Sequence, residues 1–379
     1  MKLLKKTFLA TAIAAMAITQ SHAQITITPE NDDFSLKLIG RTNIDAGTYF
    51  NRYATDHVDN GIAINDTRLG VMGSFLKNWD YKIEICFDKK AISFRDVFIK
   101  YNFNSKHHLQ FGNVFMGYGL KPLGLAYKFI DDATVDNTLC PARKIGLVYL
   151  LTTDHFNFNG GVYSDGNIDN GNSKFDQGVI LSAKAIYRPI IDETTVLHIG
   201  VAPMYTNSPN AATFTGVFPE TFTTAGNTPR YILHDGSNGA AVSFDGTHYS
   251  RYEAELIFIQ QKFLFETHYQ GASFELNNNR YHVGGILAQC SYLLIGDQQN
   301  YNKKTGLCQN ASPRNLEILA RYDYLDLNDG GNQGDLTIGV NYFFTKHFNM
   351  KLNYGVVQEH HGDYHKTYNA VQVRAQFSF

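Results

Sequence analysis

The chain has 379 residues, a formal net charge of −2 and 44% hydrophobic residues. A charge so close to zero argues against a nucleic-acid partner, because nucleic acids attract basic surfaces. With 27 Phe, 23 Tyr and 32 Gly, and a mean hydropathy of −0.25, the composition suits a barrel whose alternate residues face lipid and water. A secreted soluble β-protein would have a similar composition, so the pattern along the chain has to distinguish the two classes.

Residues 1–23 have the pattern of a secretory signal peptide. Three lysines open the segment, residues 7–18 are apolar, and Ser21-His22-Ala23 is a cleavage site of small residues around a variable one. The apolar run is too short for a membrane-spanning helix, and no apolar run of about 18 residues follows it. We therefore expect cleavage after Ala23 and one domain over residues 24–379.

Apolar and polar residues alternate with a period of two through most of the remaining chain. The segment DYKIEICFD at 80–88 is an example: its charges lie on one face, and the other face carries none. This period is typical of strands, and a soluble sandwich would show it too. A total of 16 such strands without a helical pattern to cover them favours lipid contact. We predict strands at 34–45, 66–75, 80–88, 96–103, 106–114, 142–152, 154–164, 176–189, 194–206, 249–259, 262–274, 280–296, 313–325, 333–345, 347–358 and 366–379.

The last strand, YNAVQVRAQFSF at 368–379, has one apolar face that ends in Phe379. Because an unpaired sheet edge is not tolerated in hydrocarbon, we expect this strand to pair with the first and close a barrel. The sequence therefore predicts an all-β fold, a transmembrane antiparallel β-barrel of about 16 strands.

The connections between these strands alternate in length. Short ones at 76–79, 104–106, 152–154 and 345–347 are expected on the periplasmic side, and long ones at 46–64, 115–141, 165–175 and 207–248 outside the cell. The connection at 297–312 breaks this rule, since it is long yet falls on the periplasmic side. Either the strand count is wrong there, or the segment folds into the lumen.

Several motifs resemble the phosphate-selective porin O and P family. They are LKLIGRTNIDAGTY at 36–49, NDTRLGVMGSFLKNWDYKIEICFD at 65–88, FRDVFIKYNF at 94–103, NLEILARYDYLDLNDGG at 315–331 and the final YNAVQVRAQFSF. The resemblance implies an outer-membrane porin with 16 strands, usually a homotrimer, that passes small hydrophilic solutes and anions such as phosphate or pyrophosphate. It also implies that the third extracellular loop folds inward and narrows the pore.

The loop entrance departs from the family pattern. Where the family typically reads Gly-Gln-Phe-Lys-x-Pro-Phe-Gly-Leu, residues 112–120 read GNVFMGYGL, so Phe115 stands in place of the expected Lys. Arginine can hold a phosphate in a bidentate fork, and lysine can act as a point charge. The channel-lining and anion-binding residues that we predict are Arg41, Arg68, Lys121, Lys128, Arg143 and Lys144.

The polar faces of the clearest strands carry nearly balanced charge, and we expect most of these residues to form cross-strand ion pairs. Any anion preference must then come from local arrangement. The basic residues on these faces are Lys37, Arg41, Arg68, Lys82, Lys100, Lys184, Arg188, Arg251, Arg321, Lys351 and Arg374, and the acidic ones are Asp45, Asp80, Glu84, Asp88, Asp96, Glu253, Glu255, Glu266, Glu317 and Asp323.

Other clusters point to no cofactor. The segment HHGDYH at 360–365 resembles a metal-binding motif, but polar residues are usual in an external hairpin, so no metal is expected. The four cysteines allow three full pairings, and free thiols are an equal alternative. A barrel enzyme and a plugged structural or adhesive barrel remain alternative functions. An enzyme would need a nucleophile or acid–base pair held in contact, and no spacing here enforces one.

Overall fold

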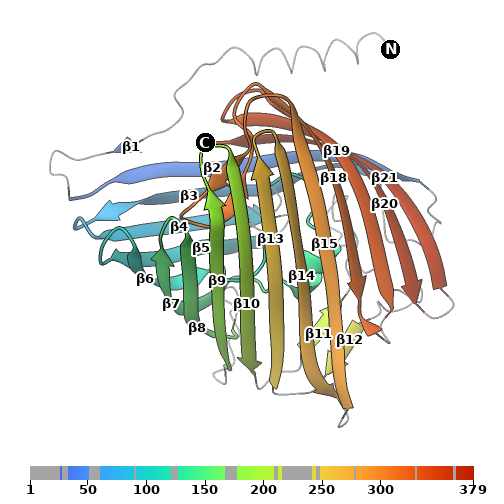
Figure 1. Cartoon of the computed structure of the whole chain (residues 1–379), viewed down its shortest axis with the longest axis horizontal. Helices are drawn as coiled ribbons and strands as arrows, with labels where there is room; N and C mark the ends of the chain where they lie inside the picture. Colours follow the sequence, from blue (N-terminus) through green and yellow to red (C-terminus); the bar gives the residue numbers. More distant parts are fainter. Residues whose placement is uncertain are drawn as a thin grey trace.

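Sixteen strands of the computed structural model form an antiparallel barrel (Figure 1). The predicted signal peptide, residues 1–23, lies outside the described part of the chain, and so does its cleavage site. The structure describes residues 26–27, 33–50, 60–88, 91–120, 127–166, 177–208, 212–215, 241–244, 248–276, 279–328, 331–361 and 364–379.

All 16 predicted strands are present, and each strand pairs antiparallel with the strand on either side of it in the barrel. A short segment, β1 (Thr26–Ile27), also pairs with β2. The barrel strands are β2 (Leu36–Phe50), β3 (Gly61–Phe75), β4 (Trp79–Asp88), β5 (Ala91–Asn102), β6 (His107–Val114), β7 (Lys144–Thr152), β8 (Phe156–Ser164), β9 (Val179–Ile191), β10 (Thr195–Asn207), β13 (His248–Gln260), β14 (Phe263–Leu276), β15 (Asn279–Ile295), β18 (Asn315–Asp326), β19 (Asn332–Phe343), β20 (Phe348–His361) and β21 (Tyr364–Ser378).

The barrel closes where the sequence predicts. β2 pairs with β21 from Arg41↔Ser378 to Phe50↔Asn369. Beyond the last pair, the backbone of Phe379 exchanges two 3.0 Å hydrogen bonds with Gly40. The ring of Phe379 lies so close to Gly40 that a Cβ there would overlap it, which explains a glycine at this point. Because β21 bonds β20 on one side and β2 on the other, no edge of the barrel is left open.

The two faces of each strand differ in the way that a lipid-embedded barrel requires. Along β18, Glu317, Arg321 and Asp323 point inward and are buried, whereas Ile318 and Tyr322 lie on the outside, 40% and 48% exposed. Exposed large aliphatic and aromatic side chains recur on the outer face of nearly every barrel strand. Such a continuous apolar surface is unfavourable in water and favourable in lipid.

Arginine at Leu352 is expected to destabilise the folded barrel by about 2–4 kcal/mol if the site lies near the bilayer midplane, because the charge would face hydrocarbon. Leu352 is 48% exposed on the outer face of β20. The matched control is Gln110→Arg, since Gln110 pairs with the inward-facing Lys100 and should tolerate a charge. Urea unfolding in lipid vesicles measures both. Equal losses of stability at the two positions would contradict lipid contact at Leu352.

The structure corrects three strand boundaries, and one of them is the start of β5, which lies at Ala91 and not at residue 96. The predicted loop at 46–64 is too long, because β2 continues to Phe50 and β3 begins at Gly61. Asp66 interrupts the regular alternation there with a positive φ of 52°, so that Asn65 and Asp66 are both buried. A bulge of this kind hides the period of two from a reading of the sequence.

The long periplasmic connection at 297–312 contains a small hairpin of β16 (Asn300–Asn302) and β17 (Leu307–Gln309). This hairpin folds into the lumen. The Tyr301 hydroxyl lies 3.0 Å from Nδ1 of His198, and the Asn157 amide donates to the carbonyl of Lys303 at 2.9 Å. Both partners belong to the inner face of the barrel wall. The strand count of 16 therefore holds, and the inward-folding alternative is correct.

The described residues hold one helix, α2 (Thr134–Leu139), between β6 and β7, and one further hairpin, β11 (Ala212–Thr215) with β12 (Ala241–Phe244). No helix in the described ranges is both long and apolar enough to span a bilayer. All four cysteines, Cys86, Cys140, Cys290 and Cys308, are free thiols.

Candidate pore constriction

The connection at 115–143, called the inward loop here, crosses the lumen and binds the opposite wall. Near its start, the Tyr118 hydroxyl donates to the carbonyl of Tyr252 at 2.9 Å. Further on, the Tyr127 hydroxyl donates to Glu266 at 2.9 Å. Burial raises the pKa of Tyr127, and Glu266 adds to this shift, so the hydroxyl keeps its proton. These contacts confirm the inward-folded third extracellular loop.

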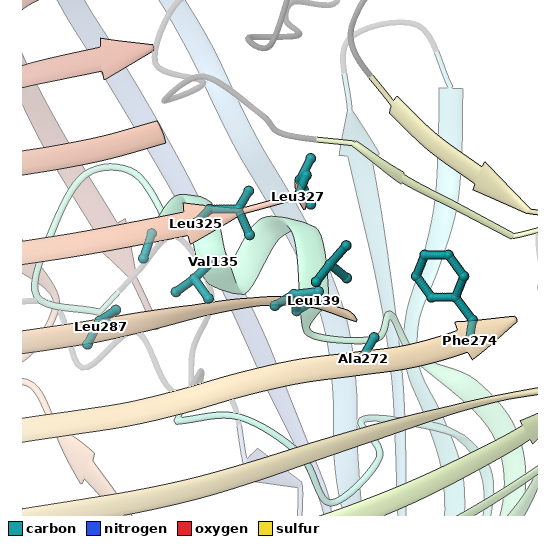
Figure 2. Packing of buried hydrophobic residues seen from close by; sticks show 9 residues of the cluster. Val135, Leu139, Ala272, Phe274, Leu287, Leu325 and Leu327 are labelled. Atoms are coloured by element: carbon teal, nitrogen blue, oxygen red, sulfur yellow. The ribbon is translucent and has the colours of Figure 1, made fainter. Parts of the chain in front are cut away.

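Helix α2 fixes the deepest part of the inward loop by apolar packing. Figure 2 shows Val135 and Leu139 of α2 between side chains of the wall, among them Leu287 on β15 and Leu325 on β18. Val135, Leu139 and Leu325 are completely buried. Each fully buried side chain of this kind stabilises the fold by about 1.5–3 kcal/mol. The inner face of β14, β15 and β18 therefore carries apolar residues because a loop, not water, covers it.

Two carboxylates of the barrel wall accept hydrogen bonds from the first residue of α2. The backbone N–H of Thr134 donates to Asp323 at 2.8 Å, and its hydroxyl donates to Asp335 at 2.5 Å. Negative charge at a helix N-terminus is favourable because it faces unsatisfied N–H groups. Asp131 accepts a 2.6 Å hydrogen bond from Gln372 of β21. Asp131, one of the acids of the inward loop, therefore faces the wall.

The loop leaves the two sides of the lumen unequal in exposure to water. On the side that it covers, the ion pairs Lys184–Glu255 and Arg374–Asp45 have side-chain exposures between 0% and 7%. On the opposite side, Lys82 and Asp96 are 18% and 19% exposed. The water-accessible part of the lumen therefore lies against β3–β5 and the Arg41 end of β2, whereas Asp45 of β2 is covered.

Alternating charges cross this accessible wall from β2 to the end of the inward loop. Arg41 binds Asp66, which also lies 2.5 Å from Nε of Arg68. Lys82 lies 3.6 Å from Glu84 and 2.6 Å from Asp96, Arg68 reaches Glu84 at 3.6 Å, and Arg143 reaches Asp96 at 2.6 Å. We call this set the charge band, and its members are Arg41, Asp66, Arg68, Glu84, Lys82, Asp96 and Arg143.

Phe115, which replaces the lysine that the family resemblance leads us to expect, has a structural partner. The guanidinium carbon of Arg143 lies 3.8 Å from the centre of the Phe115 ring. Burial lowers the pKa of the Arg143 guanidinium, and the Asp96 carboxylate opposes that shift. Since arginine stays protonated at neutral pH, the stack and the carboxylate together hold a permanent cation at the loop exit.

The structure brings together three of the six predicted anion-binding residues. Arg41, Arg68 and Arg143 belong to the charge band, and Lys121 lies outside the described residues. Lys128 is only 2% exposed and its ammonium binds Glu317, so it faces the covered wall and not the accessible lumen. The Lys144 ammonium donates to the carbonyl of Asp165 at 2.5 Å.

Sequence reasoning missed two residues of this region. Asp66 joins Arg41 to Arg68 but is absent from the wall acids that we predict from the sequence, although it shares the polar face of its strand with Arg68. Gln299, next to the periplasmic hairpin, accepts from Lys128 at 3.0 Å and donates to Glu317 at 3.2 Å. The inward loop and the periplasmic connection therefore meet inside the barrel. No local sequence pattern predicts this contact.

A family model described as phosphate-selective porin O and P matches residues 36–379. The chain belongs to this family. A protein of Caulobacter vibrioides described as uncharacterized is 25% identical over 358 residues, which cover 86% of this porin and 69% of the relative.

Solved structures with this barrel are also outer-membrane proteins. A loop-deletion mutant of OmpT from Vibrio cholerae matches with a TM-score of 0.61 at 15% identity, over 92% of this chain and 100% of that one. The anion-selective porin from Comamonas acidovorans matches with a TM-score of 0.60 at 12% identity, over 92% and 100% of the two chains. At such identities the likeness establishes the fold. Together with the family match, it makes this protein an outer-membrane channel.

Proposed function

We propose that this porin passes small hydrophilic solutes along β2–β5, with a weak to moderate preference for anions that include phosphate. The observation that carries the proposal is the charge band, in which four cations face three carboxylates. Among these seven side chains the excess is one positive charge. Selectivity in a channel follows the charges at its narrow section, so a small excess gives a small preference.

The charge band contains side chains of the type that binds phosphate. Arg68 and Arg143 present guanidinium groups, which bind phosphate oxygens through paired hydrogen bonds. Both are already engaged by carboxylates, so a passing phosphate must compete with Asp66 and Asp96. Tight phosphate binding is therefore not expected. Lys121, which the sequence places in the inward loop, remains a further candidate cation on sequence grounds.

The proposal includes no enzymatic activity. The two buried histidines of the wall have partners within the protein: Nε2 of His198 lies 2.9 Å from Glu255, and Nε2 of His268 lies 3.2 Å from Asp136. Such partners suit wall residues that support the inward loop. The proposal also includes a homotrimer in the outer-membrane lipid, since one related solved structure, OmpT of Vibrio cholerae, is described as a trimer form.

The test is the reversal potential of the purified protein in a planar bilayer under a KCl gradient. We expect ohmic conductance steps and a reversal potential on the anion side. In the double variant Arg68→Gln and Arg143→Gln the band changes from an excess of one positive charge to an excess of one negative charge, so the reversal potential should move toward cation preference. The shift should shrink near 1 M salt, where the screening length is about 3 Å.

Lys346→Gln provides the control, because Lys346 is exposed in the short turn between β19 and β20, outside the charge band. It should leave the reversal potential unchanged. A parent protein that prefers cations would overturn the anion assignment. A protein without conductance steps would instead support the plugged barrel.

A further inference from the structure

Two histidines face each other at the external end of the closing hairpin. His360 of β20 and His365 of β21 are partners in the strand register. Their Nδ1 atoms are 2.7 Å apart, and the ring centres are 4.6 Å apart with the rings nearly perpendicular, at 78°. Directly opposed residues of an antiparallel pair have Cβ atoms about 4.5–5.5 Å apart, so the backbone itself holds the two rings together.

The pair lies beyond the apolar belt of the barrel. On the outer face of β20, Leu352 and Tyr354 are exposed to lipid, whereas the next exposed outward position is Gln358, opposite Thr367. At about 3.4 Å per residue, His360 lies roughly 20 Å along the strand from Tyr354. Both imidazoles are exposed. An ion from the external water can therefore reach them without crossing the lipid.

The short distance between the nitrogens has a chemical consequence. A contact of 2.7 Å between two Nδ1 atoms requires one ring to donate a proton from Nδ1 and the other to accept it at an unprotonated Nδ1. If the donor ring carries its proton on Nε2 instead, two lone pairs converge on one point. Converging neutral imidazoles are ligands that Zn²⁺, Cu²⁺ and Ni²⁺ prefer.

The sequence alone predicts no metal at HHGDYH, but the facing imidazoles change this expectation: we propose that His360 and His365 bind a divalent first-row transition-metal ion, Cu²⁺ or Zn²⁺, at the outer surface of the hairpin. Metal–nitrogen bonds of about 2.0–2.1 Å at a tetrahedral angle place the two nitrogens about 3.3 Å apart, so the rings need to separate by roughly 0.6 Å. Small rotations of two exposed side chains supply that change. Among the described residues, His360 and His365 are the two ligands that we assign to this ion.

The experiment uses folded full-length protein in detergent and Cu²⁺ as the probe. Electron paramagnetic resonance counts the nitrogen ligands of the bound copper, and a titration gives its affinity. We expect one bound ion with two imidazole nitrogens in the parent protein. In His360→Gln and in His365→Gln, the affinity of that site should fall at least about tenfold, because each variant removes one of two ligands.

His248→Gln is the matched control. His248 also lies at the external end, but its Nδ1 faces the hydroxyl of Tyr205 at 3.1 Å and not a second imidazole. It should leave the two-nitrogen signal unchanged. If both variants of the pair keep the parent affinity, or if only one of them loses it, the two-histidine site is refuted. Unchanged conductance of each variant shows that it folds, and the metal readout is independent of ion selectivity.

Discussion

A chain shortened to end at Thr367 is expected to form no stable barrel in lipid. The deletion of residues 368–379 removes all ten β2–β21 pairs, from Arg41↔Ser378 to Phe50↔Asn369, and most of the pairs that β20 makes with β21. Two strands would then present unpaired backbone groups to hydrocarbon, at a cost of several kcal/mol for each group. The measurement is refolding into vesicles, followed by heat-modifiable migration on a gel.

The variant Phe379→Ala distinguishes the contribution of the closing strand from that of its last aromatic ring. The variant keeps the two backbone hydrogen bonds between residue 379 and Gly40, so it should still close and migrate as a folded barrel. Only the ring that covers Gly40 is lost. A truncated chain that refolds as well as the parent would show that another strand closes the barrel.

Much of this architecture follows from the sequence because a barrel imposes one simple rule on every strand. The period of two appears in each of the 16 strands, and the closing strand is recognisable from its one apolar face. The alternation of inward and outward residues fails where the backbone conformation of a strand is irregular. The positive φ at Asp66 turns two successive residues inward, and a register shift between Ile83 and Ile85 displaces β4 against β5. Both irregularities lie beside the charge band.

The candidate site was harder to predict, because it depends on which wall the inward loop covers. Lys184 and Lys82 are both inward-facing lysines on polar strand faces, yet the first is buried with Glu255 and the second is accessible. The difference arises from the path of the inward loop, which accepts the Lys184 ammonium at the carbonyl of Gly119 at 2.9 Å. The partner of Lys128 could not be predicted from the sequence for the same reason, because Glu317 is 189 residues away in the chain.

Asp96 is the carboxylate of the charge band whose removal should change selectivity most, because its side chain is 19% exposed, against 12% for Glu84 and 3% for Asp66. It binds two cations at once, Lys82 and Arg143, each at 2.6 Å. Asp96→Asn raises the excess of positive charge in the band from one to two, and it leaves Arg143 stacked on Phe115 without its carboxylate. One added positive charge about 6 Å from a passing ion lowers the energy of an anion by about 0.7 kcal/mol in water and raises that of a cation by the same amount, so the anion-to-cation permeability ratio should rise about tenfold.

The reversal potential of Asp96→Asn in a KCl gradient should therefore move further to the anion side, opposite in sign to the shift of the Arg68 and Arg143 double variant. Asp96→Glu is the conservative control, because it keeps the carboxylate and should stay near the parent value. Asp80→Asn is the positional control: Asp80 pairs with Lys100 at 2.8 Å, outside the band. It should have a smaller effect if the band lines the narrowest section. Equal shifts for Asp80→Asn and Asp96→Asn would mean that the narrowest section does not lie at the band, and no shift for either would place the ion path away from β4 and β5 altogether.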